Sequence, residues 1–349
     1  MKAFVMREIG SVGFMEKPIP RPGPGDAIVR TTKALICTSD SHTVAGGIGP
    51  RENLTLGHEA VGVVHEVGSD VKVFQPGDRV LVGAITPDWG DPAAQNGFPS
   101  QSGMALGGFK FANSKDGVFA EYFHVNEADA NMAKIPDDIS DDLAVYCADM
   151  LSTGFMGAEK GNIPIGGTVA VLALGPVGMM AAAGARLRGA GLVIGVESVP
   201  QRQDLARTYG VDEIVDFSRE DVVERIMELT HGEGVDTAIE ALGMDATFQT
   251  AIKITKPGGT VSNIGYFGEG EFVRIPRVAW GVGMADQTIA TGLCPGGRVR
   301  MERLLRVLQA KRLDPTGMTT HEFEFDDMEQ AFEVLDKKLD DVIKPLISF

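Results

Sequence analysis

Three short segments, far apart in the sequence, carry the residue types that bind zinc. Cys37 begins Cys-Thr-Ser-Asp-Ser-His, His58 and Glu59 lie in Leu-Gly-His-Glu-Ala-Val-Gly, and Asp149 follows Tyr-Cys-Ala. A thiolate, an imidazole and a carboxylate suit zinc, and three protein ligands with an open position are typical of a catalytic site. Each residue also has an ordinary reading, as a buried apolar cysteine, a hydrogen-bonded histidine and a helix-capping aspartate. The spacing alone leaves both readings open.

A glycine-rich turn is the second candidate site. It lies between an apolar, strand-like run and an uncharged helical run. Its residues are Ala173, Leu174, Gly175, Pro176, Val177 and Gly178. This is the G-x-G-x-x-G fingerprint of dinucleotide-binding folds, with alanine in the first glycine position. Such a turn lets the backbone approach a pyrophosphate at a helix N-terminus, here near Val177, and proline is tolerated there. An ordinary βα turn without a ligand is the alternative.

Glu197 ends the next strand-like run, about 20 residues beyond the glycine-rich turn, where an acid binds the adenosine ribose in dinucleotide-binding folds. A carboxylate accepts hydrogen bonds from a ribose diol and repels a 2′-phosphate. The next cationic residue is Arg202, five positions later. We therefore expect NAD(H) to be favoured over NADP(H). A solvated strand end is the alternative reading of Glu197.

The sequence pattern changes near residues 150–165. Earlier runs such as 27–30, 60–67 and 79–82 are short, β-rich and separated by Gly, Pro and Asp, and residues 88–116 are expected to form a long loop. From about residue 166, strand-like and helical runs alternate, with helices expected at 222–229 and 246–254. The six expected strands are 168–173, 192–196, 213–216, 235–240, 260–264 and 288–290. Alternation of this kind predicts a parallel sheet covered on both faces, the doubly wound Rossmann fold.

The last part of the chain differs from the α/β pattern before it. Two amphipathic helices are expected at 301–313 and 328–337, followed by a strand at 342–347. We expect this tail to rejoin the first domain. The predicted division is therefore a mostly β domain of residues 1–152 plus 295–349, and an inserted dinucleotide-binding domain of residues 153–294.

Composition excludes several classes of function. The chain has 349 residues and a formal net charge of −16, which disfavours binding to nucleic acid. Its three cysteines do not form a disulfide framework, and residues 1–8 lack the apolar core of a signal peptide, so the cytoplasm is the expected location. Residues 168–185 are uncharged, but glycines and a proline interrupt them. They are expected to form a strand and a buried helix and not a membrane span.

Combined over nearly the whole chain, the motifs resemble those of zinc-dependent medium-chain dehydrogenases/reductases, especially the tetrameric bacterial secondary alcohol dehydrogenases. The resemblance extends to Pro-Gly-Asp-Arg-Val at 76–80, Thr-Pro-Asp-Trp at 86–89, Lys-Asp-Gly-Val-Phe at 115–119, Tyr-Phe-His-Val-Asn at 122–126, Thr-Gly-Phe at 153–155 and Gly-Leu-Cys-Pro-Gly-Gly-Arg at 292–298. It implies that both chain ends form a GroES-like catalytic domain. It further implies a homotetramer, with residues 294–298 contributing to the interface.

The resemblance assigns the metal ligands and the cofactor. It implies that Cys37, His58 and Asp149 bind the catalytic zinc, with Glu59 as an exchangeable fourth ligand or a group beside the ligands. A four-cysteine structural zinc site, found in many relatives, needs more cysteines than the three present. NADP-using members carry Gly-Ser-Arg where this chain has Glu-Ser-Val from residue 197, which agrees with the expected preference for NAD(H).

The chemistry that the resemblance implies is hydride transfer between a secondary alcohol and the nicotinamide, with zinc as the Lewis acid. Ser39 would pass the proton through the nicotinamide ribose to His42 at the surface. A turn-forming hydroxyl and a solvated loop histidine are the alternatives for these two residues. The expected pocket is mostly apolar, which favours ketones over polyols. Its residues are Ala84, Ile85, Phe109, Met284, Leu293 and Cys294, with Tyr266 shared with the cofactor site.

Three other functions remain open from the sequence. The first is a polyol, butanediol or acetoin dehydrogenase of the same superfamily, which substrate profiling would distinguish. The second is a zincless NAD(P)H:quinone reductase, against which Cys37, His58 and Asp149 argue together. The third is a dinucleotide-binding protein without enzyme activity, because a fold does not by itself imply a function.

Overall fold

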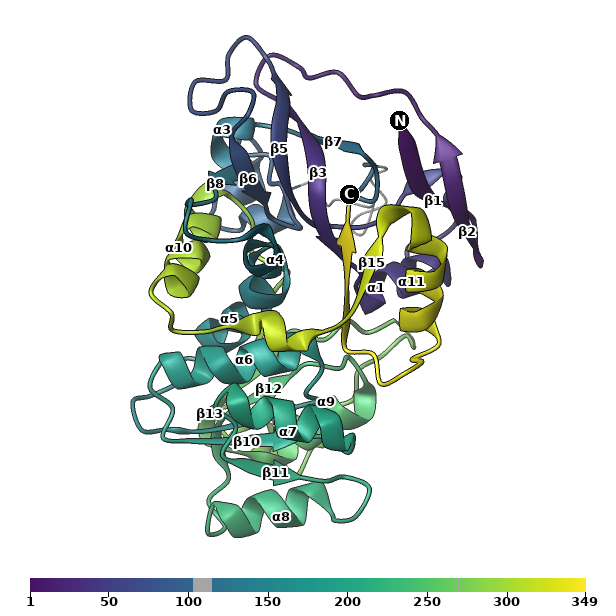
Figure 1. The fold of residues 1–349 in the computed structure, drawn as a ribbon. Coiled ribbons are helices and arrows are strands. Elements are labelled where there is room, and N and C mark those ends of the chain that lie inside the picture. The colour runs from purple at the N-terminus through teal and green to yellow at the C-terminus, as the bar shows by residue number, and fades with distance from the viewer. Residues whose placement is uncertain (103–114, 269) are drawn as a thin grey trace. The chain divides into compact units, whose positions relative to one another are not determined.

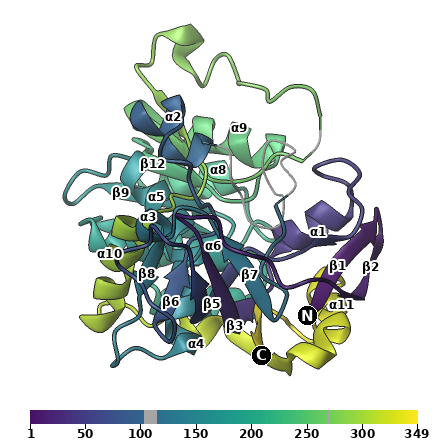
Figure 2. The same cartoon turned by 90° about the horizontal axis from the view of Figure 1, so that it is seen from above.

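The computed structural model describes residues 1–102, 115–268 and 270–349. The chain divides into two compact units (Figures 1 and 2), one of Met1–Ser152 with Cys294–Phe349 and one of Thr153–Leu293. The chain thus returns from the second unit to the first between Leu293 and Cys294, one residue before the predicted position. Each unit is described separately.

A seven-stranded sheet forms the centre of the first unit. Six strands run in the order β15-β16-β3-β5-β6-β8, and β7 pairs with β3. Their bounds are β3 Ala27–Leu35, β5 Glu59–Val67, β6 Arg79–Val82, β7 Tyr122–Val125, β8 Met132–Lys134, β15 Thr319–Glu324 and β16 Lys344–Ser348. Strand β16 lies antiparallel to β3, with Leu346 opposite Leu35. The C-terminal strand therefore completes a sheet that the N-terminal part of the chain begins.

A smaller sheet and several helices surround this centre. The smaller sheet has the order β2-β1-β4, with β1 Lys2–Glu8, β2 Ser11–Glu16 and β4 Leu54–Thr55. The helices are α1 Thr38–Val44, α2 Pro92–Gln95, α3 Ala128–Asn131, α4 Asp141–Ala144, α10 Arg298–Gln309 and α11 Met328–Asp336. The rings of Phe4 in β1 and Phe332 in α11 lie 5.7 Å apart. The two chain ends thus share one apolar core.

Two expectations about this unit are wrong. Residues 88–116 are not wholly a loop in their described part, because Asp91 accepts a hydrogen bond from the backbone N–H of Ala93 and begins α2. The helix expected at 301–313 begins three residues earlier, at Arg298, and ends at Gln309. Lys311 has φ of 54°, which no α-helix contains.

The second unit holds a parallel sheet of six strands in the order β11-β10-β9-β12-β13-β14. Their bounds are β9 Thr168–Leu172, β10 Leu192–Val196, β11 Glu213–Val215, β12 Val235–Glu240, β13 Thr255–Asn263 and β14 Thr288–Thr291. Counted from β9, this is the strand order 3-2-1-4-5-6 of the Rossmann fold, as expected. Apolar side chains of β9, β10, β12 and β13 form its core.

Helices connect the strands of this sheet. They are α6 Pro176–Leu187, α7 Pro200–Thr208, α8 Val222–Leu229 and α9 Asp245–Ile254, while α5, Met150–Lys160, leads in from the first unit. The uncharged run 168–185 forms β9 and most of α6, whose residues 178–185 are buried. Within the described residues, no helix has the length and apolarity that a bilayer span requires.

Candidate active site

Local structure fixes the positions of Cys37 and His58. Cys37 lies directly before α1, where the Asp40 carboxylate accepts a hydrogen bond of 2.9 Å from the Cys37 backbone N–H. His58 follows Gly57, which has φ of +87° and whose α-carbon lies against the ring of Phe119. A Cβ at residue 57 would lie 2.4 Å from that ring, so only glycine fits there. The Gly57 N–H also bonds to Asp40, which ties the two segments together.

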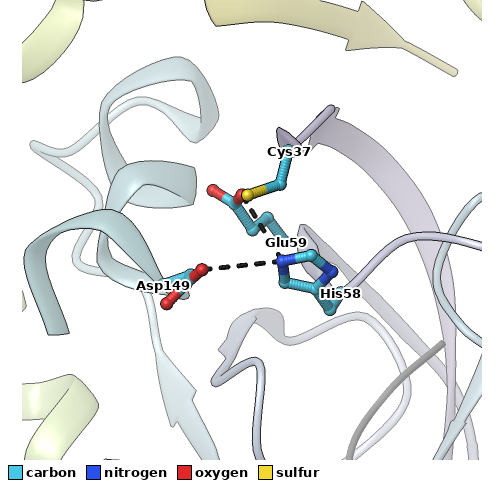
Figure 3. A group of neighbouring side chains, drawn as sticks. All are labelled: Cys37, His58, Glu59 and Asp149. Atoms are coloured by element: carbon cyan, nitrogen blue, oxygen red, sulfur yellow. Dashed lines mark ion pairs between the residues drawn. The ribbon is translucent and has the colours of Figure 1, made fainter. Parts of the chain in front are cut away.

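Four side chains converge in the first unit (Figure 3). Cys37, His58, Glu59 and Asp149 each offer one ligand atom, and all four atoms lie within 4.8 Å of one another. His58 Nε2 is 3.5 Å from Asp149 Oδ2 and 3.8 Å from Glu59 Oε1. The sequence proposed these four residues, and the structure brings all of them together.

Asp40 orients the histidine from its other ring nitrogen. The Asp40 carboxylate lies 3.4 Å from His58 Nδ1, and both side chains are buried. Burial lowers the pKa of His58, but the charge of Asp40 and hydrogen bonds to Asp149 and Asp40 raise it well above its usual value. A carboxylate on Nδ1 leaves Nε2 facing the cluster, as in many metal-binding histidines. Asp40 was not singled out from the sequence, although it lies three residues after Cys37.

Lys344 is the second residue that the sequence did not indicate. Its Nζ lies 2.6 Å from Glu59 Oε1, and the side chains are 2% and 0% exposed. Burial raises the pKa of Glu59 to about 7, and Lys344 acts in the opposite direction. The position of a lysine inside an apolar C-terminal strand was the only available signal, because lysine is rarely buried without a partner.

The cluster fits a zinc ion. Glu59 Oε2 is buried and has no hydrogen-bond partner among the described residues, which is costly unless another group binds it. The donor set of sulfur, nitrogen and carboxylate oxygen also suits zinc. Cys147 is fully buried and lies outside the cluster, and burial raises the pKa of its thiol. The cysteine of the cluster is therefore Cys37.

The two proposed relay residues lie on α1. Ser39 Oγ is 3.2 Å from His58 Nε2, so its hydroxyl lies beside the cluster. His42 is on the same helix and is exposed. This places one hydroxyl at the site and one imidazole at the surface.

The predicted pocket residues fall in both units. In the first unit, Ala84 and Cys294 are buried and both contact the carbonyl oxygen of Ala148, the residue before Asp149. Ile85 is buried beside Ala84. Tyr266, Met284 and Leu293 belong to the second unit, and Phe109 lies outside the described residues. Ala84 and Cys294 thus contact the residue that precedes Asp149, and the roles of all the pocket residues stay predictions.

The glycine-rich turn lies between β9 and α6 of the second unit. Gly175 directly precedes α6, Pro176 is its first residue, and Val177 follows, so backbone N–H groups of the first turn point out of the helix. Gly178 packs so closely that a Cβ there would lie 2.0 Å from the Ala173 carbonyl oxygen. Ala173 itself has φ of 75°, a left-handed conformation that a glycine in this position of the fingerprint would adopt without strain.

Glu197 follows β10, next to the glycine-rich turn. Strands β9 and β10 are paired, with Leu172 opposite Val196, so Ala173 and Glu197 follow neighbouring strand ends. Glu197 Oε1 accepts hydrogen bonds from the backbone N–H groups of Ser198 and Val199, and Oε2 lies 3.8 Å from Arg202. The carboxylate is therefore held at the C-terminal end of β10, beside the strand end from which the glycine-rich turn begins, where an acid binds the adenosine ribose in this fold.

Comparison with known proteins gives the family. An alcohol dehydrogenase GroES-like domain matches residues 23–137, and a zinc-binding dehydrogenase domain matches residues 176–303. The chain is 54% identical to the NADP-dependent isopropanol dehydrogenase of Thermoanaerobacter brockii, with 99% of each chain covered, and 48% identical to that of Clostridium beijerinckii, also with 99% of each covered. A solved alcohol dehydrogenase from Thermus sp. ATN1 superposes with a TM-score of 0.91 at 30% identity, covering 100% of this chain and 99% of that one. The chain therefore belongs to the zinc-dependent medium-chain dehydrogenases/reductases, as one of their nicotinamide-dependent alcohol dehydrogenases.

Proposed function

We propose that the chain interconverts secondary alcohols and ketones at the cluster of Cys37, His58, Glu59 and Asp149. The observation that carries the proposal is the convergence of four ligand atoms within 4.8 Å in one unit, with a buried glutamate oxygen that lacks a partner. The substrate class is supported by the relatives named isopropanol dehydrogenases, which match this chain over 99% of its length. The apolar character of Ala84, which bonds to the residue before Asp149, and of Ile85 agrees with a ketone.

When bound, zinc would act as a Lewis acid on the substrate oxygen. The protein supplies the remaining functions. Asp40 holds His58 in one orientation, Ser39 places a hydroxyl beside Nε2 for proton transfer, and Lys344 holds Glu59. His42, at the surface on the same helix, is proposed to exchange the proton with water.

The test combines metal analysis with activity. The purified protein should contain about one zinc per chain and oxidise NADH with a simple methyl ketone, as a catalytic zinc site requires. Chelation should abolish the activity, and added zinc should restore it. Metal-free protein that still turns over would contradict the zinc mechanism and favour a quinone reductase.

We further propose that NAD(H) is preferred, although the relatives named above are NADP-dependent. The argument is local. Glu197 ends β10 as a carboxylate, and the two residues that follow it, Ser198 and Val199, are uncharged. A 2′-phosphate next to this carboxylate would be repelled, and Arg202 is already engaged by Glu197.

A double variant tests the cofactor proposal. Replacing Glu197→Gly and Val199→Arg removes the repelling charge and adds a guanidinium, which binds phosphate well. The ratio of kcat/KM for NADPH to that for NADH should rise about 10- to 100-fold or more, as a change of 1.4–2.8 kcal/mol implies. Val199→Leu is the control and should leave the ratio unchanged. A wild-type enzyme that prefers NADPH would overturn the proposal.

We also propose a homotetramer. Residues 272–284 of the second unit expose several large apolar side chains, which are Phe272, Val273, Ile275, Val278, Val282 and Met284. The exposed fraction of Met284, for example, is 77%. Clustered exposed apolar side chains are typical of subunit contacts. Light scattering after size-exclusion chromatography gives the mass directly, and a monomer would contradict the proposal.

A further inference from the structure

Within residues 1–102, 115–268 and 270–349, the ammonium group of Lys115 bonds to two neutral side chains. Its Nζ donates to Thr86 Oγ1 at 3.0 Å and to Asn126 Oδ1 at 2.6 Å. No carboxylate of the described residues lies within ion-pair distance of it. Burial of the ammonium group lowers the pKa of Lys115 to about 7, against the effect of Asp26. The side chain is half-buried, and the two hydrogen bonds hold its ammonium group against Thr86 and Asn126.

Two asparagines, Asn126 and Asn131, bind the backbone of residues 86–87, the segment that Lys115 contacts through Thr86. Asn126 Nδ2 donates to the carbonyl oxygens of Thr86 and Pro87, at 3.3 and 3.1 Å. Asn131, fully buried, donates to the carbonyl oxygens of Pro87 and Asn126 and accepts from the indole N–H of Trp89. Lys115, Asn126 and Asn131, here called the Lys115 network, thus bind residues 86–89 through their side chains.

The residues just before this segment, Ala84 and Ile85, are held by close backbone contacts. A Cβ on Gly296 would lie 1.8 Å from the Ile85 carbonyl oxygen, so the 294–297 segment packs directly on Ile85. The backbone N–H of Ala84 donates to the carbonyl oxygen of Ala148 at 3.0 Å. Residues 84–87 therefore lie between the Lys115 network and the chain that carries Asp149.

We infer that Lys115 is a positioning residue for the substrate side of the site, fixing residues 84–87 against the segment that carries Asp149. The inference rests on the proposed function, with Ala84 and Ile85 lining the substrate pocket as the family resemblance implies. The hydrogen bonds of Lys115 go to Thr86 and Asn126 and not to a cluster residue, so it acts through these two side chains. Losing it should change how well ketones of different size fit, while leaving the metal in place.

The test uses the zinc-loaded enzyme with Lys115→Met, which keeps the length of the side chain and removes the donor. Hydrogen exchange of the 84–90 peptide should quicken about 3- to 10-fold, as the loss of one or two hydrogen bonds implies. The ratio of KM for a long methyl ketone to KM for propanone should change by a similar factor, about 3- to 10-fold. Zinc content and kcat for propanone should stay within about twofold, since no ligand is altered.

Two further variants keep the test decisive. Lys17→Met is the matched control, because Lys17 bonds Asp116, Thr55 and the Asn53 carbonyl but nothing in 84–89. Thr86→Val removes one acceptor at constant size, and it should produce a weaker form of the Lys115→Met effect even where Lys115→Met fails to fold. Unchanged exchange and an unchanged KM ratio in Thr86→Val or Lys115→Met would overturn the inference. If Lys115→Met or Thr86→Val exchanges faster but the wild-type protein reduces no ketone at all, the proposed function is rejected. The positioning of residues 84–87 by Lys115 is then retained.

Discussion

The two candidate sites are built from different parts of the chain. The metal cluster is made of four titratable side chains from segments near residues 37, 58 and 149, and Lys344 pairs with its Glu59. The nucleotide site is made mostly of backbone, from one turn between β9 and α6, with Glu197 as its charged side chain. A site built from buried charges depends on every member being paired, whereas a site built from one turn depends on local conformation. Substitutions should therefore propagate in the first site and remain local in the second.

Removing a metal ligand should have the largest effect. Cys37→Ser takes away the thiolate of the cluster, so zinc binding and activity should be lost together. The Lewis-acid contribution of several kcal/mol corresponds to a loss of about 10³-fold or more in kcat. Cys147→Ala is the matched control, because Cys147 is buried outside the cluster. Zinc content and initial rates measure both, and a Cys37→Ser enzyme with full zinc and activity would contradict the assignment.

The pairing of charges within the metal site can be tested at Lys344. Lys344→Met leaves Glu59 buried without its cation, which typically costs about 3–5 kcal/mol in the free energy of unfolding. The double variant Lys344→Met/Glu59→Gln removes both charges and should recover much of that loss. Urea denaturation at pH 8, with and without zinc, gives the values. Equal stability of the single and double variants would show that the pair is not coupled.

A smaller loss is expected at Asp40, which binds no metal in the proposed site. Asp40→Asn keeps the size of the side chain but weakens its interaction with His58 Nδ1. Partners of metal-binding histidines typically contribute about 10- to 100-fold in metal affinity, and we expect that range here. Competition with a chromophoric chelator measures the zinc affinity. An unchanged affinity would restrict Asp40 to capping α1 through the Cys37 N–H.

The two sites also differ in how far the sequence predicted them. Five of the six strands of the parallel sheet were predicted to within one residue, because alternating β and α runs are local and strongly periodic, whereas β13 begins at Thr255, five residues before its predicted start. The four residues of the cluster were proposed mainly by resemblance, since spacing cannot show that residues 37, 58 and 149 meet. Lys344 was missed because its role depends on β16 pairing with β3, a contact across almost the whole chain. Asp40 was missed because its role depends on two segments that meet only in the fold, since its carboxylate accepts from the backbone N–H groups of Cys37 and Gly57.

The smallest expected effect is that of Ala173→Gly, which tests whether the nucleotide site depends on the local conformation of its turn. Ala173 holds φ of 75°, a conformation that costs an alanine about 1–2 kcal/mol and glycine almost nothing. Ala173→Gly should therefore stabilise the protein, by a net of about 0.5–1 kcal/mol after the greater chain entropy of glycine is counted. Ala182→Gly, the same change inside α6, should instead destabilise by about 1 kcal/mol. Chemical denaturation compares the two. A loss of stability of similar size at both positions would mean that the turn accepts alanine without strain, and that the substitution at the first glycine position is neutral for the fold.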